Sequence, residues 1–226
     1  KRLYDRLVAG SAGEVRAHLG ADLDYQRGLV RFLENHDEPR AAATFRPERE
    51  HPAAVAVATL PGGVLWHDGQ ADGRRVHLPV FLGRFPAEAP DEGRRAWYEQ
   101  LLEVASTEHV RHGDWRLLEI TGWPDNHTNE NLLAWAWSDP PAADDPAAPV
   151  GLYAELPHHV VVLNLSDGAA QGRVRLPFPR LAAQQWSLTD ALSGDVFDRD
   201  GTELAGDGLF VALPPWGVHV LRVSAG

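Results

Sequence analysis

The chain has 226 residues, which is enough for one large domain or two small ones with a real hydrophobic core. Its 21 basic and 32 acidic residues give a net charge of −11, which argues against a nucleic acid or an anionic membrane as partner because no basic stripe is present to neutralise phosphates. The absence of cysteine excludes disulfides, thiolate metal sites and a thiol nucleophile, and no apolar run approaches the ~20 residues that span a bilayer.

The chain opens at Lys1 in the middle of a pattern, with neither a methionine nor a targeting segment. We therefore expect it to be a piece of a longer protein. The first clear helix signal is a capping box at Ser11 and Glu14, where each side chain can bond an otherwise unpaired N–H group. It predicts a short helix that buries Val15 and Leu19.

Residues 1–112 alternate helix and strand signals, as βα units do. The predicted order is helix, strand, helix, strand, helix, over residues 11–19, 28–33, 51–60, 64–66 and 90–105. Both strands are short and apolar, which is typical of parallel strands that are buried on both faces. Each is followed by a group of His, Asp and Asn residues, at 34–38 and 67–70. Parallel α/β folds carry their chemistry at these strand ends.

Residues 113–226 change character and predict six or more short strands without helices. The predicted strands cover residues 132–137, 160–165, 173–176, 186–189, 209–213 and 218–223. Residues 138–149 contain four Pro, three Asp and four Ala, and we expect a long solvent-exposed loop there. The fold class is therefore α/β followed by an all-β antiparallel sandwich or barrel.

The segment from Phe32 to Asp37 reads Phe-Leu-Glu-Asn-His-Asp. It resembles the seventh-strand signature of the α-amylase superfamily of glycoside hydrolases, Phe-x-x-Asn-His-Asp. Residues 61–70 look like that family's eighth strand and its exit. The remaining chain, up to Pro214-Pro215-Trp216, is similar to the β-sandwich that closes these enzymes. The resemblance covers nearly the whole chain in the right order.

The resemblance implies a partial (β/α)8 barrel, or TIM barrel, of two strands with their helices over residues 1–112, and a C-terminal β-sandwich over 113–226. It implies retaining cleavage or transfer of α-glucosidic bonds in an α-glucan or maltooligosaccharide. Asp37 matches the family's transition-state-stabilising Asp, and His36 matches a His that hydrogen-bonds the same sugar.

The nucleophile and the acid/base of the family have no counterparts in this chain. Retention requires two carboxyl groups about 5–5.5 Å apart, so we expect the chain alone to be inactive. Its expected partner is the missing N-terminal part of the barrel. No cofactor or metal is predicted from this chain, and the calcium that is frequent in the family is held by segments that are absent here.

Several alternatives stay open on the sequence. Asp37 could instead bond backbone N–H groups in a turn at the strand end. Glu34, Asp37 and Asp68 could form a local carboxylate pair, because adjacent strands lie about 4.8 Å apart. We expect Arg40 to pair with a nearby acid. The chain as a whole could be a carbohydrate-binding module or a purely structural β-sandwich module without a catalytic role, and for the sandwich we favour the structural role.

Two histidine pairs and three tryptophans carry weaker signals. His109 and His112 have the spacing of a helical metal site, but we favour a solvated helix end, where the helix dipole suits histidine. The pair at 158–159 precedes a predicted strand, and we expect it on the surface. Trp123 could stack on a sugar ring, whereas Trp135 and Trp137 are expected in the core.

Overall fold

A computed structural model describes residues 1–79, 81–84, 86–139 and 156–226 of the chain. The chain divides into two compact units, Lys1–Ala105 and Ser106–Gly226. The boundary predicted between residues 112 and 113 falls just after helix α7, Glu108–His112, which the structure assigns to the second unit. The predicted loop at 138–149 lies outside the described residues from 140 onwards. None of the described helices has the length and apolar character needed to cross a bilayer.

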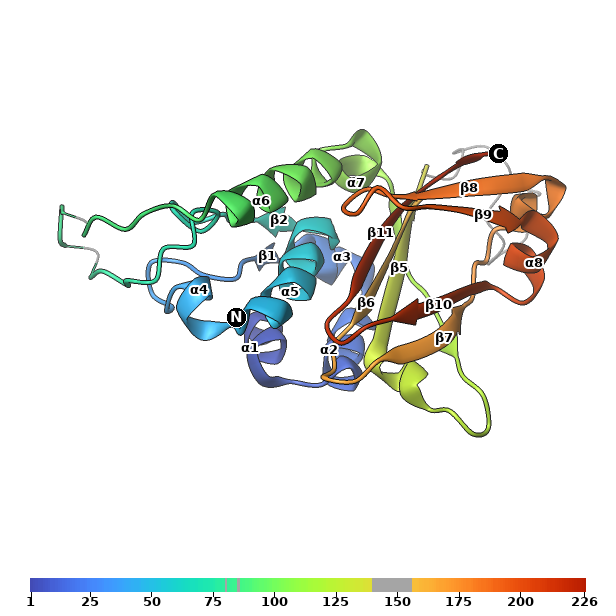
Figure 1. Ribbon diagram of the computed structural model, residues 1–226, viewed down its shortest axis with the longest axis horizontal. Coiled ribbons are helices and arrows are strands. Elements are labelled where there is room, and N and C mark those ends of the chain that lie inside the picture. The colour runs from blue at the N-terminus through green and yellow to red at the C-terminus, as the bar shows by residue number, and fades with distance from the viewer. Residues whose placement is uncertain (80, 85, 140–155) are drawn as a thin grey trace. The chain divides into compact units, whose positions relative to one another are not determined.

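The first unit is α/β and consists of short helices around a two-stranded parallel sheet (Figure 1). Its helices are α1 (Arg2–Ala9), α2 (Ala12–Leu19), α3 (Leu23–Arg27), α4 (Ala41–Thr44), α5 (Pro47–Thr59) and α6 (Glu92–Ala105), and its strands are β1 (Val30–Arg31) and β2 (Gly63–Val64). The predicted capping box is present: Ser11 Oγ accepts from the Glu14 N–H, and the Glu14 carboxylate accepts from the Ser11 N–H. Val15 and Leu19 are fully buried as predicted.

Helix α5 is buried over most of its length and packs against α6. Its small apolar residues allow this close approach, and Pro47 suits the first helical position because its missing N–H would have no partner there. Helix α6 buries Tyr98, Leu101, Val104 and Ala105. The strands are shorter than the predicted 28–33 and 64–66. The chain enters β2 through Gly62, whose φ of 110° and close approach to the Leu29 carbonyl leave no room for a side chain.

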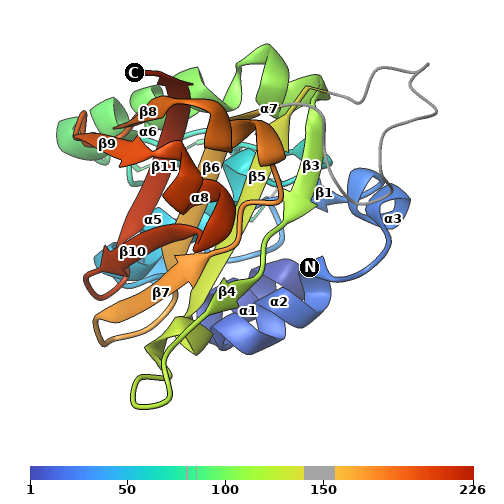
Figure 2. The ribbon, with the colours of Figure 1, turned by 90° about the vertical axis from the view of Figure 1, so that its right-hand side faces the viewer.

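The second unit is an antiparallel all-β domain of two sheets (Figure 2). The larger sheet has the order β3-β5-β6-β11-β8-β9, with bounds Asp114–Leu117, Leu132–Ser138, Pro157–Asn164, Val218–Ala225, Gln185–Asp190 and Val196–Asp200. The smaller sheet has the order β10-β7-β4, with bounds Leu209–Leu213, Ala170–Val174 and Ile120–Thr121. Short 3-10 helices lie at Thr128–Asn131 and Pro179–Ala183.

The core of the second unit lies between the two sheets. Leu132, Ala134 and Val162 of the larger sheet and Val174 and Val211 of the smaller one belong to one cluster of buried side chains. The alternation along β10, buried at every second residue, is that of a strand with one face on a core. All six predicted strands are present, with shifts of up to three residues at their ends.

The expectation of strands without helices in this half is wrong. Helix α8, Gly201–Gly206, follows β9, and Asp200 caps it by accepting from two backbone N–H groups. The sequence prediction also omitted β3, β4 and β9. Strand β9 lies at the edge of the larger sheet and is half-exposed or exposed throughout, so its Asp and Arg residues hide the apolar period on which a strand prediction depends.

Candidate functional site

The two strands of the first unit place the predicted polar segments next to each other. Strands β1 and β2 pair in parallel, with Val30 opposite Gly63 and Arg31 opposite Val64. Both strands therefore end at the same edge of the sheet, where residues 34–38 and 67–70 follow. The expectation that the strands lie side by side and parallel is confirmed.

Glu34 is the buried anchor of this edge, with none of its side chain exposed. Its Oε1 atom lies 3.0 Å from Arg40 Nη2, and its Oε2 atom accepts from the Ala41 N–H at 2.6 Å. Burial raises the pKa of Glu34 to about 7, and the Ala41 N–H and the Arg40 guanidinium act against that rise. Arg40 is buried with it, so the prediction that Arg40 pairs with a nearby acid is confirmed.

His67 shares the same guanidinium. Its Nδ1 atom lies 2.7 Å from Arg40 Nη1 and 3.3 Å from Glu34 Oε1. Because arginine can only donate, Nδ1 must accept, and the neutral imidazole carries its proton on Nε2. Burial and the Arg40 charge both lower the pKa of His67, which favours this neutral form. The ends of β1 and β2 are thus joined through one arginine.

Asn35, His36 and Asp37 form a turn directly after this anchor. Asn35 Oδ1 accepts from the backbone N–H groups of Asp37 at 2.8 Å and Glu38 at 2.9 Å. This is an Asx turn, in which a side chain supplies the acceptor. The carbonyl oxygen of His36 lies 2.9 Å from His77 Nε2, which ties the turn to the following loop.

The carboxylate of Asp37 stands outside that turn. Its side chain is 76% exposed, and Oδ2 lies 3.3 Å from His36 Nε2. Within the described part of the chain, this imidazole is the carboxylate's partner, and Asn35 has the backbone-bonding role that Asp37 would have in a simple turn. The site residues that the sequence proposed, His36 and Asp37, are therefore adjacent and accessible to a ligand.

The three acids of this edge have separate basic partners. Glu34 is bound to the buried guanidinium, Asp37 lies against His36, and Asp68 Oδ2 is 2.9 Å from Arg74 Nη1. Asp68 is exposed, so its ion pair is screened by solvent. Each of these three carboxylates therefore has its own basic partner. This arrangement argues against the alternative in which two of them form a local pair for acid/base chemistry.

The tryptophans divide as the sequence suggests. Trp135 and Trp137 are buried, which confirms the expectation that they belong to the core. Trp123 is half-buried and makes an edge contact with Phe210, with ring centroids 6.0 Å apart. Phe210 is the exposed aromatic side chain among the described residues of the second unit. One such side chain does not form the row of aromatics that a sugar-binding sheet face presents.

Comparison with known proteins identifies the fold. No family model matches the chain, and no curated protein gives a significant match. Solved structures do match: the maltogenic α-amylase AmyB from Thermotoga neapolitana, at 13% identity and a TM-score of 0.64, aligns with 98% of this chain and 48% of its own. The α-amylase from Geobacillus thermoleovorans aligns at 15% identity and a TM-score of 0.61, over 98% of this chain and 46% of its own. A cyclomaltodextrinase aligns at 14% identity and a TM-score of 0.59, over 99% of this chain and 35% of its own.

The chain has the fold of part of an α-amylase-family enzyme. The resemblance of the chain to the α-amylase superfamily is thereby confirmed at the level of the fold. The chain spans about half or less of the length of the α-amylase-family structures it matches.

The sequence does not single out His67 or His77 for the contacts they make. Both lie in polar stretches, and the motif at residues 32–37 does not predict which later residues contact that segment. The one available signal for His67 is its place directly after the second strand, because the carboxyl ends of parallel strands meet at one edge. His77 has no comparable signal.

Proposed function

We propose that this chain is part of a retaining glycoside hydrolase acting on α-linked glucans or maltooligosaccharides. Its contribution to catalysis is the Asp37 carboxylate, which stabilises the transition state. One observation carries the proposal: the Asp37 carboxylate is 76% exposed at the carboxyl end of β1, on a turn whose backbone bonds are made by Asn35.

The chemistry suits a carboxylate held in this way. Glycosidic cleavage passes through an oxocarbenium-like transition state, and hydrogen bonds to the sugar hydroxyls strengthen as positive charge develops. Charge-assisted hydrogen bonds are roughly twice as strong as neutral ones. His36, 3.3 Å from Asp37, presents a second polar group toward the same sugar. The buried Glu34–Arg40 pair anchors the chain beside the turn, from which both side chains extend.

The first unit is proposed to be the last two βα units of a (β/α)8 barrel. Its order of elements and its parallel strands support this. Val30 of β1 is 60% exposed, and a groove of about 450 Å³ runs beside it, lined by Tyr4, Tyr25 and Phe32 among others. Exposed apolar side chains beside an open strand edge suit a neighbouring strand. The partner for this edge is the remainder of the barrel.

The nucleophile and the acid/base are proposed to lie outside this chain. The purified chain incubated with maltoheptaose should therefore release no reducing sugar. Measurable turnover from pure chain would refute this division of roles, because it would require both a nucleophile and an acid/base within residues 1–226.

Substitution of Asp37 tests the central role in the longer enzyme that contains this chain. Asp37→Asn keeps the size of the side chain and removes its charge, and kcat should fall by about 100-fold or more. The matched control is Asp68→Asn, an equally exposed acid at the end of the neighbouring strand, which should change kcat by less than about threefold. Equal, small effects of both substitutions would refute the proposal.

The second unit is proposed to be structural. The single exposed aromatic of its described residues, Phe210, supports a bracing domain over a carbohydrate-binding module. Titration calorimetry of the chain with maltoheptaose should detect no binding that depends on this unit. Binding that Phe210→Ala and Trp123→Ala abolish would favour the binding module instead.

A further inference from the structure

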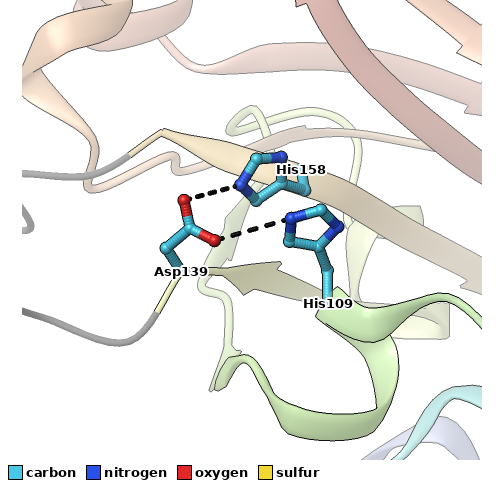
Figure 3. Close-up of side chains that lie close together, drawn as sticks. All are labelled: His109, Asp139 and His158. Atoms are coloured by element: carbon cyan, nitrogen blue, oxygen red, sulfur yellow. Dashed lines mark ion pairs between the residues drawn. The ribbon is translucent and has the colours of Figure 1, made fainter.

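Three polar side chains of the second unit converge from separate elements. His109 lies on α7, Asp139 directly follows β5, and His158 lies near the start of β6. Figure 3 shows the carboxylate of Asp139 facing both imidazole rings. One ligand atom from each side chain lies within 4.8 Å of the other two. The cluster belongs entirely to the second unit, whereas Asp37 belongs to the first.

The distances match those of a metal site. Asp139 Oδ2 lies 3.0 Å from His158 Nε2, and Asp139 Oδ1 lies 3.5 Å from His109 Nε2. In a tetrahedral zinc site with bonds of 2.0–2.1 Å, neighbouring ligand atoms are about 3.3 Å apart. The two contacts use different oxygens of Asp139, and the three donor atoms lie within 4.8 Å of one another, so side-chain shifts of up to about 1.5 Å would place all three donors around one ion.

An Asp–His pair alone accounts for only part of the cluster. Asp139 and His158 lie at ion-pair distance, and His158 holds the pKa of Asp139 below its usual range, yet a second imidazole, that of His109, faces the same carboxylate. The rings of His109 and His158 stack with centroids 3.5 Å apart, which would place two charges together if both were protonated.

We propose that His109, Asp139 and His158 bind one Zn²⁺ ion. Two imidazoles and one carboxylate are a common zinc ligand set, and the fourth position stays open to water. The three side chains are between 33% and 50% exposed, so an ion can reach them from solvent. Nitrogen donors select zinc over calcium and magnesium, which take oxygen ligands.

The ion would stabilise the second unit by joining a helix to a sheet. Helix α7 already packs against β5 and β6, and the ion would bond to His109 of α7, to His158 of β6 and to Asp139, the residue after β5. This is a structural role, and it does not depend on the glycosidase proposal. Zinc should therefore raise the Tm of the chain whether or not Asp37 is catalytic.

The test uses the full chain, stripped of metal with a chelator and then titrated with Zn²⁺ by calorimetry. We expect one equivalent bound with micromolar affinity or better, and a higher Tm. Co²⁺, a coloured substitute, should give the visible absorption of a tetrahedral site. His109→Gln and Asp139→Asn, both at partly exposed positions, should each weaken Zn²⁺ binding at least tenfold and keep the far-UV spectrum unchanged. Millimolar Ca²⁺ should not displace Zn²⁺ from the chain.

The matched control is His112→Ala. His112 lies one turn along the same helix and is the partner that a purely helical site would use, whereas the proposed site does not include it. This substitution should leave the affinity for Zn²⁺ within twofold. The proposal is overturned if the chain binds no Zn²⁺, if the cluster variants bind as tightly as the wild type, or if His112→Ala weakens binding as much as His109→Gln does.

Discussion

Arg40→Met should destabilise the first unit strongly, because it leaves a carboxyl group buried without its counter-charge. Arg40 and Glu34 are 3% and 0% exposed, with Nη2 and Oε1 3.0 Å apart. Methionine keeps the length of the aliphatic stem and removes the guanidinium. Because Glu34 has a folded pKa of about 7 and can take up a proton, its lost counter-charge accounts for about 1 kcal/mol at pH 8. Arg40 also donates to His67 Nδ1 and to the Asp68 carbonyl, and two acceptors left unpaired add about 2 kcal/mol. The expected total loss is therefore about 3 kcal/mol at pH 8.

The size of the loss should depend on pH, because Glu34 can escape the penalty by protonation. With its folded pKa of about 7, Glu34 takes up a proton at a cost of about 1 kcal/mol at pH 8, whereas at pH 5 it is already protonated. The cost of Arg40→Met should shrink accordingly as the pH falls. The double variant Arg40→Met/Glu34→Gln should recover this contribution of Glu34 at pH 8, since no charge is then buried.

The measurement is hydrogen exchange at the Ala41 amide, which donates to Glu34 Oε2 at 2.6 Å, together with thermal unfolding. At pH 8 the loss corresponds to exchange faster by about 100-fold or more. Arg27→Ala is the control, because its contact with Asp24 is exposed and 3.8 Å long, and it should cost less than about 1 kcal/mol. A similar small cost for Arg40→Met, or no recovery in the double variant, would refute the reasoning.

Three further outcomes are expected. Glu34 has a pKa of about 7 in the folded chain and 4.5 in the unfolded chain, so its contribution to stability is present below pH 4.5 and is lost as the pH rises through 7. The lost contribution is about 3 kcal/mol, and Glu34→Gln should flatten the resulting fall in Tm between pH 5 and 8. Asn35→Ala removes two turn hydrogen bonds and should cost about 1–2 kcal/mol in thermal unfolding. Gly201→Ala would place a Cβ atom 1.8 Å from a backbone oxygen and should lower Tm sharply, whereas Gly206→Ala, in the same helix with open space around it, should leave Tm nearly unchanged.

Local signals in the sequence determined much of this protein. The Ser11 capping box, the buried face of α6 and the six predicted strands depend on contacts between near neighbours along the chain or on a regular period. Such patterns are readable because burial repeats every 3.6 or 2 residues. The candidate site could also be predicted from the sequence, because the residues of the segment 32–37 form one contiguous motif. Strand β9 was not predicted because neither face of this exposed edge strand has to be apolar, and its sequence therefore has no regular apolar period.

Only the tertiary structure decided which distant residues meet. The sequence offered His112 as the companion of His109, yet the structure brings Asp139 and His158 to it, and it buries His159, which was expected on the surface. It also assigned the Asx turn to Asn35 and left the Asp37 carboxylate accessible. Pairings across many residues arise from the register of strands and the packing of helices on them. No local period in the amino-acid sequence records which side chains those long-range contacts will bring together.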